Sequence, residues 1–177
     1  MPLKDPRSPP QARWCLACCL LFASAPGAQN PTMPNAGSTA DVVAIARSIV
    51  LCHSSVDVPL VPAAGVDALR RRLATLEPGR EVYLVVDGLR VDVDPGALYH
   101  VELVGAARPV PVAGVGSFSV FGVSHREGAT AQRSFVVTTP LRELSEGRGG
   151  IGVRFVPDAT AVAGARVGIG SVYLAVQ

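Results

Sequence analysis

Three histidines are the residues best suited to bind a metal in this chain: His53, His100 and His125. A protein metal site needs several such ligands close together, at short spacing or on facing elements. These three lie far apart in the sequence and on different predicted elements. We expect His53 at a kink, His100 at a solvent-facing position of a strand and His125 in a loop. The sequence therefore predicts no metal site, and a site shared by all three is the weakest alternative.

Nucleophilic catalysis has no clear signature either. Cys52 adjoins His53 in the sequence, but adjacency does not make a catalytic dyad, and no Gly-x-Ser-x-Gly elbow is present. We expect Cys52 to be a small buried hydrophobic residue. Asp92 and Asp94 flank one strand residue, where we expect them to face water at a hairpin. We therefore predict no catalytic residue and no bound cofactor, and we interpret the chain as not an enzyme.

Two further stretches resemble ligand-binding motifs but have simpler explanations. The glycines between 147 and 152 are not followed by Gly-Lys-Ser/Thr, so they predict a loop and not a phosphate site. The arginines 70–72 are expected to form the solvated face of a helix. The net charge is only +2 and the basic residues are scattered, which predicts no binding to nucleic acid.

The N-terminal residues 1–28 have the layout of a secretory signal peptide. Positive residues (Lys4, Arg7, Arg13) precede an apolar run from Trp14 to Ala25, and small residues follow to Ala28. This run is shorter than the roughly 20 residues that cross a bilayer, so we predict no stable membrane insertion after cleavage. We expect a secreted or periplasmic protein, and the richness in Ala, Val, Gly and Arg favours a high-GC bacterium.

Residues 29–44 have the composition of a flexible linker, and residues 45–177 are expected to fold as one domain. Hydrophobic residues make up 49% of the chain and charged residues 17%, a balance that favours a packed core over disorder. Cys15, Cys18 and Cys19 lie within the apolar run of the signal peptide, so cleavage would leave Cys52 alone.

The predicted elements of the domain are one helix and many short strands. Apolar residues at three-to-four spacing predict the helix at 64–76, and Pro78-Gly79 ends it. Before the helix, residues 47–52 and 55–60 predict one or two short strands separated by a kink at His53-Ser54. After the helix, alternation predicts strands at 81–86, 89–93, 98–104, 114–123, 133–137, 151–156 and 167–176. The fold class is therefore all-β: an antiparallel immunoglobulin-like β-sandwich with one short amphipathic helix near its N-terminal side.

Four local predictions follow from the same patterns. Asp87-Gly88 predicts a hairpin turn. The alternation of residues 98–104 directs His100 to solvent. Phe118 and Val120 are expected on opposite faces of their strand. Residues 138–140 are expected to cap a short helical turn that carries two leucines, Leu141 and Leu144.

The order of these elements resembles the C-terminal β-domain of the bacterial and plant-type tyrosinases and polyphenol oxidases. Five stretches carry the likeness: Val82–Arg90 (VYLVVDGLR), Pro95–Leu103 (PGALYHVEL), Val115–Gly122 (VGSFSVFG), Val136–Leu144 (VVTTPLREL) and Val153–Pro157 (VRFVP). The likeness extends over nearly all of the predicted mature chain.

In this family a separate helical domain holds two copper ions with six histidines, and the β-domain covers the entrance of that site. Three histidines cannot supply this ligand set, so the resemblance does not imply oxidase activity. It implies a noncatalytic exported accessory module that binds or shields a separately encoded tyrosinase-like copper protein, or another protein. The candidate contacts are Phe118 and Phe121, with burial of both in the core as the alternative.

Two other functions stay open. The chain could be a free-standing β-sandwich that binds a surface or a carbohydrate, although its only tryptophan lies in the predicted signal peptide. The last alternative is a small copper carrier that uses His53, His100 and His125. The sequence does not predict the oligomeric state.

Overall fold

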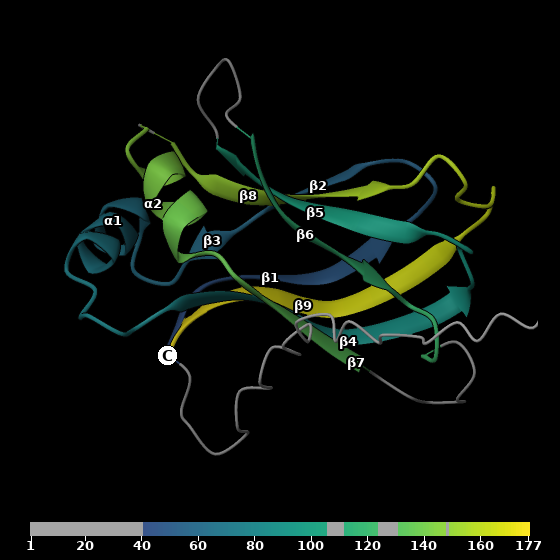
Figure 1. The fold of residues 1–177 in the computed structure, drawn as a ribbon, viewed down its shortest axis with the longest axis horizontal. Helices are drawn as coiled ribbons and strands as arrows, with labels where there is room; N and C mark the ends of the chain where they lie inside the picture. Colours follow the sequence, from purple (N-terminus) through teal and green to yellow (C-terminus); the bar gives the residue numbers. More distant parts are fainter. Residues whose placement is uncertain (1–40, 106–111, 124–130, 148) are drawn as a thin grey trace, which may run out of the picture. The chain divides into compact units, whose positions relative to one another are not determined.

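The computed structural model describes residues 41–105, 112–123, 131–147 and 149–177. In this part of the chain two antiparallel sheets face each other and two short helices lie together at one end of them (Figure 1). The predicted all-β sandwich is thus confirmed. The predicted signal peptide, most of the predicted linker and His125 lie outside the described residues.

The first sheet has five strands in the order β3-β1-β9-β4-β7. Its strands are β1 (Asp41–Leu51), β3 (Val61–Pro62), β4 (Val82–Val93), β7 (Ala131–Val136) and β9 (Arg166–Val176). Strand β1 begins at Asp41, so residues 41–44, which we expected in the linker, belong to the sheet. Pairing explains this early start, because Ala44 lies opposite Leu174 and is fully buried.

The second sheet has four strands in the order β2-β8-β5-β6. Its strands are β2 (Val56–Pro59), β5 (Leu98–Gly105), β6 (Val112–Ser119) and β8 (Ile151–Pro157). The alternation expected for residues 98–104 is confirmed, because Tyr99, Val101 and Leu103 are buried whereas His100 is exposed. This sheet therefore has one inner and one solvated face.

An aromatic cluster forms the core surface of the second sheet. The Phe118 ring stacks on Tyr99 at a centroid distance of 5.7 Å and meets Phe155 edge-on at 6.2 Å. Phe118 and Val120 are both buried, so the prediction of opposite faces was wrong. Residues two positions apart in an extended chain point to the same face. Phe118 and Val120 both point to the inner face.

The predicted hairpin turn at Asp87-Gly88 was also wrong, because β4 continues through it. The pairing of β4 with β7 shifts register between Val86 and Leu89, which marks a β-bulge. Gly88 has a φ of 67° there, and a Cβ atom on it would lie 3.2 Å from the Cα of Gly170 on the neighbouring strand. Glycine is thus required at position 88 for two reasons: it adopts the positive φ of the bulge, and it lets the two strands approach closely.

The two helices are α1 (Val66–Ala74) and α2 (Thr138–Ser145). The first confirms the helix predicted at 64–76, and the second is the predicted helical turn, with Leu141 and Leu144 buried. Thr138 does not cap α2, whose N-cap residue is Val137. Instead the Oγ1 atom of Thr138 accepts a hydrogen bond from the Val82 N–H at 2.8 Å, which joins the start of β4 to the start of α2.

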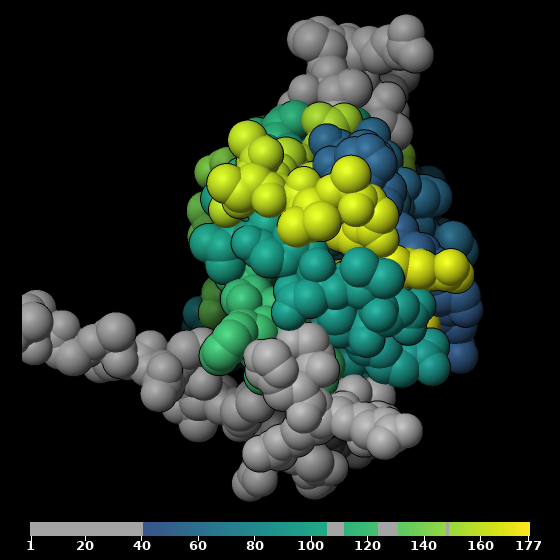
Figure 2. Space-filling model, turned by 90° about the vertical axis from the view of Figure 1, so that its right-hand side faces the viewer, coloured from purple at the N-terminus to yellow at the C-terminus, as the bar shows by residue number. Residues whose placement is uncertain are grey.

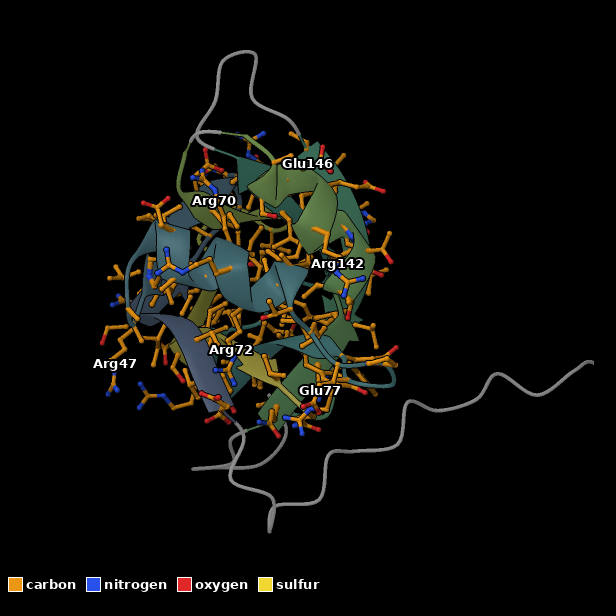
Figure 3. All side chains as sticks on the ribbon, turned by 90° about the vertical axis from the view of Figure 1, so that its left-hand side faces the viewer. Arg47, Arg70, Arg72, Glu77, Arg142 and Glu146 are labelled. Atoms are coloured by element: carbon orange, nitrogen blue, oxygen red, sulfur yellow. The ribbon has the colours of Figure 1, made fainter. Side chains whose placement is uncertain are left out.

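Two arginines connect the helices through backbone carbonyl groups. Arg70 of α1 donates to the carbonyl oxygen of Ser145 at 2.9 Å and also to that of Gly147. Arg142 of α2 donates to the Leu73 carbonyl oxygen at 3.3 Å. Figure 3 looks onto this end and labels both arginines. Arg70 is therefore a structural residue, which corrects the expectation that residues 70–72 form only a solvated face.

Replacement of Gly88 by alanine should lower the free energy of unfolding by about 1–2 kcal/mol, because a side chain is unfavourable at a positive φ and its Cβ would crowd Gly170. Urea denaturation of the variant measures the change. Gly114→Ala is the control, since a Cβ atom there meets no atom within 4 Å. Equal stability of Gly88→Ala and the parent protein would contradict the bulge.

Arg70→Ala should destabilise the protein by about 1–2 kcal/mol, because it leaves carbonyl groups at the end of α2 without their charged donor. Arg71→Ala is the matched control, since Arg71 is exposed on the same helix. Thermal and urea unfolding of both variants test this. If the two substitutions had the same effect, the connection between the helices would not contribute to stability.

Candidate functional site

A hollow of 440 Å³ lies among the turns that follow β4, β6 and β8. These turns are at the end of the sandwich opposite the helices (Figure 1). Three segments form it: the turn from β4 to β5, the end of β6 with the turn after it, and the residues after β8. Its lining is formed by Asp94, Gly96, Ala97, Leu98, Ser119, Phe121, Asp158 and Thr160. We call it the Phe121 hollow. Figure 2 looks onto this end, where the segment 112–123 (green) stands out beside the teal residues of β4 and β5.

Phe121 projects from a tight turn that is well fixed. The Phe121 N–H donates to the Oγ of Ser119 at 3.0 Å, and the Val123 N–H donates to the Val120 carbonyl at 3.0 Å. Val120 and Val123 are buried, at 1% and 7% exposure, whereas Phe121 is 76% exposed. Gly122 supplies the positive φ of 86° that the turn requires. The fold thus presents a large apolar side chain on an ordered support.

Phe118, the other predicted partner contact, lies in the core at 4% exposure. The register of β6 explains this position: Phe118 lies opposite Tyr99, which is fully buried. Of the two candidate contacts, only Phe121 is therefore at the surface.

Two carboxylates border the hollow, and a local bond orients each. Oδ1 of Asp94 accepts the backbone N–H of Gly96 at 2.9 Å. Oδ1 of Asp158 lies 2.5 Å from Nε2 of His100. The side chains of His100 and Asp158 are 52% and 34% exposed, so water reaches both. Neither carboxylate has an arginine or lysine partner among the described residues, so the described lining itself is acidic. The guanidinium group of Arg133 lies next to this lining and donates to the backbone carbonyl oxygen of Ser119 at 3.3 Å.

The histidines do not come together in the described part of the chain. His53 lies in the exposed bend after β1, and His100 lies on the outer face of β5 beside Asp158. His125 lies outside the described residues. No group of three or more His, Cys, Asp or Glu residues among those that the structure describes is arranged to hold a metal ion.

Cys52 is partly exposed, which corrects the expectation of a buried residue. Its chain position directly after β1, where the strand ends in a bend, explains the exposure. The Sγ atom lies 3.2 Å from the Oγ of Ser54 and not beside a catalytic base. Hydrogen bonding with the side chain and then the backbone of Ser54 lowers the pKa of the Cys52 thiol.

The residues after β8 contribute to the hollow, although no sequence motif predicts this role. Asp158 and Thr160 follow Pro157, at the point where the strand ends. Polar residues after a strand-ending proline are common in turns, so they give little signal. From the sequence we expected Asp94 to face water at a hairpin. Its position in the same hollow as Phe121 depends on the pairing of β5 with β6, which the sequence does not reveal. Asp92 forms an ion pair with Arg166 at 3.3 Å instead.

Comparison of the chain with models of known protein families gives no match, and neither does comparison with curated proteins. The resemblance to the tyrosinase C-terminal domain therefore stays a prediction from the sequence motifs. Neither helix in the described part of the chain is long and apolar enough to cross a membrane.

The lowered pKa of Cys52 predicts that its thiolate forms at a lower pH than that of an unperturbed cysteine. The pH profile of Cys52 alkylation by iodoacetamide, followed by peptide mass spectrometry, should therefore reach its midpoint at a lower pH than the profile of a cysteine in an unstructured peptide. Ser54→Ala should raise the midpoint, because the hydroxyl that stabilises the thiolate is lost. Ser55→Ala is the control. A midpoint unchanged by Ser54→Ala would contradict this cause.

Proposed function

We propose that this chain is a noncatalytic exported accessory module that binds or shields a separately encoded tyrosinase-like copper oxidase. The observation that carries the proposal is Phe121, an aromatic side chain that is 76% exposed on a turn fixed by hydrogen bonds and buried valines. Aromatic side chains on ordered supports are the usual anchors of protein interfaces, because they bury a large area at little entropic cost.

The noncatalytic part of the proposal comes from the residues that the chain supplies. Its three histidines are too few for the six ligands of a dicopper site of this family. Within the described residues, His100 is engaged with Asp158 and Cys52 with Ser54. The module therefore acts by covering or holding another protein. The five sequence stretches that resemble the tyrosinase C-terminal domain make a copper oxidase the first candidate partner.

The alternative, a free-standing module that binds a carbohydrate, has one observation in its favour. The Phe121 hollow combines an aromatic ring with hydroxyl and carboxylate groups, which are the groups that bind sugars. The hollow has a single aromatic side chain, Phe121, among the described residues. This is a small stacking surface for a sugar, so we rank protein binding first.

The test is capture of the partner from the exported fraction of the native host with the C-terminally tagged protein as bait. Copper content and diphenol oxidation are measured on what is retained. We expect a copper protein whose oxidation rate falls when the bait is added. Phe121→Ala should lower the amount retained at least about tenfold, because loss of an interface anchor typically costs more than 1.4 kcal/mol.

Val61→Ala is the matched control, because Val61 is 65% exposed on β3 and lies outside the Phe121 hollow. It should leave capture unchanged. Capture of a polysaccharide, or of no copper protein, would contradict the proposed function. Equal losses with both variants would contradict the role of Phe121.

A further inference from the structure

We propose that the Phe121 hollow binds a basic side chain, arginine or lysine, that a protein partner presents. This inference rests on the proposed function in one respect, namely that the partner is a protein. It adds the chemistry of the contact, which neither the sequence motifs nor the exposed aromatic ring specifies.

The first support is the charge of the hollow. Asp94 and Asp158 are both in its lining, and no arginine or lysine is among the described lining residues. Each carboxylate uses its Oδ1 atom in one local hydrogen bond, to the Gly96 N–H and to His100 respectively. The Oδ2 atoms have no hydrogen-bond partner among the described residues. Two oriented carboxylates therefore offer oxygen acceptors to a cation.

The apolar part of the lining fits the stem of such a side chain. Phe121 is 76% exposed and Leu98 is 40% exposed, and both are in the same lining as the carboxylates. Arginine and lysine place their methylene groups on apolar surface while the charged end reaches polar groups. A guanidinium or ammonium group also binds favourably over an aromatic face. A volume of 440 Å³ leaves room for the whole side chain.

The same features favour a cation over the neighbouring alternatives. A purely apolar anchor would have to desolvate Asp94 and Asp158 without giving them a partner, which is unfavourable. A neutral sugar would find hydroxyl groups at Ser119 and Thr160 but only one aromatic ring. An acidic ligand would be repelled by both carboxylates. A basic side chain alone uses the charge and the apolar surface together.

The test is an NMR titration of the ¹⁵N-labelled full chain with the peptide acetyl-Gly-Arg-Gly-amide. The control peptide contains citrulline in place of arginine, which keeps the shape of the side chain and removes its charge. We expect the arginine peptide to shift the amide signals of Gly96, Phe121 and Asp158, and the citrulline peptide to shift them much less. Added salt should weaken the binding, because the contact is exposed.

Asp94→Asn and Asp158→Asn test the carboxylates one at a time. Each should weaken binding of the arginine peptide up to about fivefold, as expected for an exposed ion pair. Asparagine keeps an Oδ1 atom that can accept the same local hydrogen bond, so the turn is preserved. Asp67→Asn is the control for overall surface charge, because Asp67 lies on α1 at the other end of the sandwich, where it is 81% exposed and pairs with Arg70 at 3.1 Å.

Three results would overturn the inference. One is an equal response to the arginine and citrulline peptides. Another is a loss of affinity with Asp67→Asn as large as with Asp94→Asn, which would indicate attraction to the overall surface charge. The third is a response of the same amides to methyl glucoside but not to the arginine peptide, which would indicate a sugar site. Capture of the copper oxidase is measured independently, so failure of this inference and failure of the proposed function are distinguishable.

Discussion

The burial of Phe118 against Tyr99 and Phe155 is the constraint on which the candidate site depends. The two ring contacts tie β6 to β5 and β8, and Phe118 lies directly opposite Tyr99. A slip of one residue would move Phe118 to the solvent, so the cost of exposing this ring fixes the register. With Phe118 and Val120 facing inward, the tight turn that follows leaves Phe121 outside. The exposed aromatic ring is therefore a consequence of how the core packs.

The two ends of the sandwich use their polar groups in different ways. At the helical end, Arg70 and Arg142 bind backbone carbonyls and hold α1 and α2 together (Figure 3). The guanidinium groups of these two arginines therefore already have hydrogen-bond partners within the fold. At the other end, Asp94 and Asp158 line the Phe121 hollow, and each uses its Oδ1 atom in one local hydrogen bond, while the Oδ2 atoms have no hydrogen-bond partner among the described residues. Carboxylate oxygens that could still accept a hydrogen bond from a ligand therefore lie at the same end as the exposed aromatic side chain.

This arrangement agrees with a binding role because the segments that form the hollow are already ordered before a partner binds. The Phe121 turn is held by two hydrogen bonds and by the burial of the valines on either side. The acidic groups lie on two other segments, after β4 and after β8, that are fixed by the sheets. Preorganised groups lose less conformational entropy on binding, so a small site can contribute substantially to affinity.

The sequence by itself determined the fold class, because that class follows from local patterns. Alternation placed Tyr99, Val101 and Leu103 on the inner face of one strand, and apolar spacing placed the helix that contains Leu69 and Leu73. These patterns depend only on the periods of strands and helices. Asp87-Gly88 shows where local patterns fail: the pair predicts a turn, but pairing of β4 on both sides makes it a bulge.

Only the tertiary structure decided the candidate site. Asp94, Phe121 and Asp158 come from three separate turns, and no local pattern states that these turns lie together. The pairing of β5 with both β6 and β8 brings them to one end of the sandwich. For the same reason, the sequence could not predict that Phe118 is buried whereas Phe121 is exposed. Both are phenylalanines in one short motif, and burial of one and exposure of the other depends on the strand opposite.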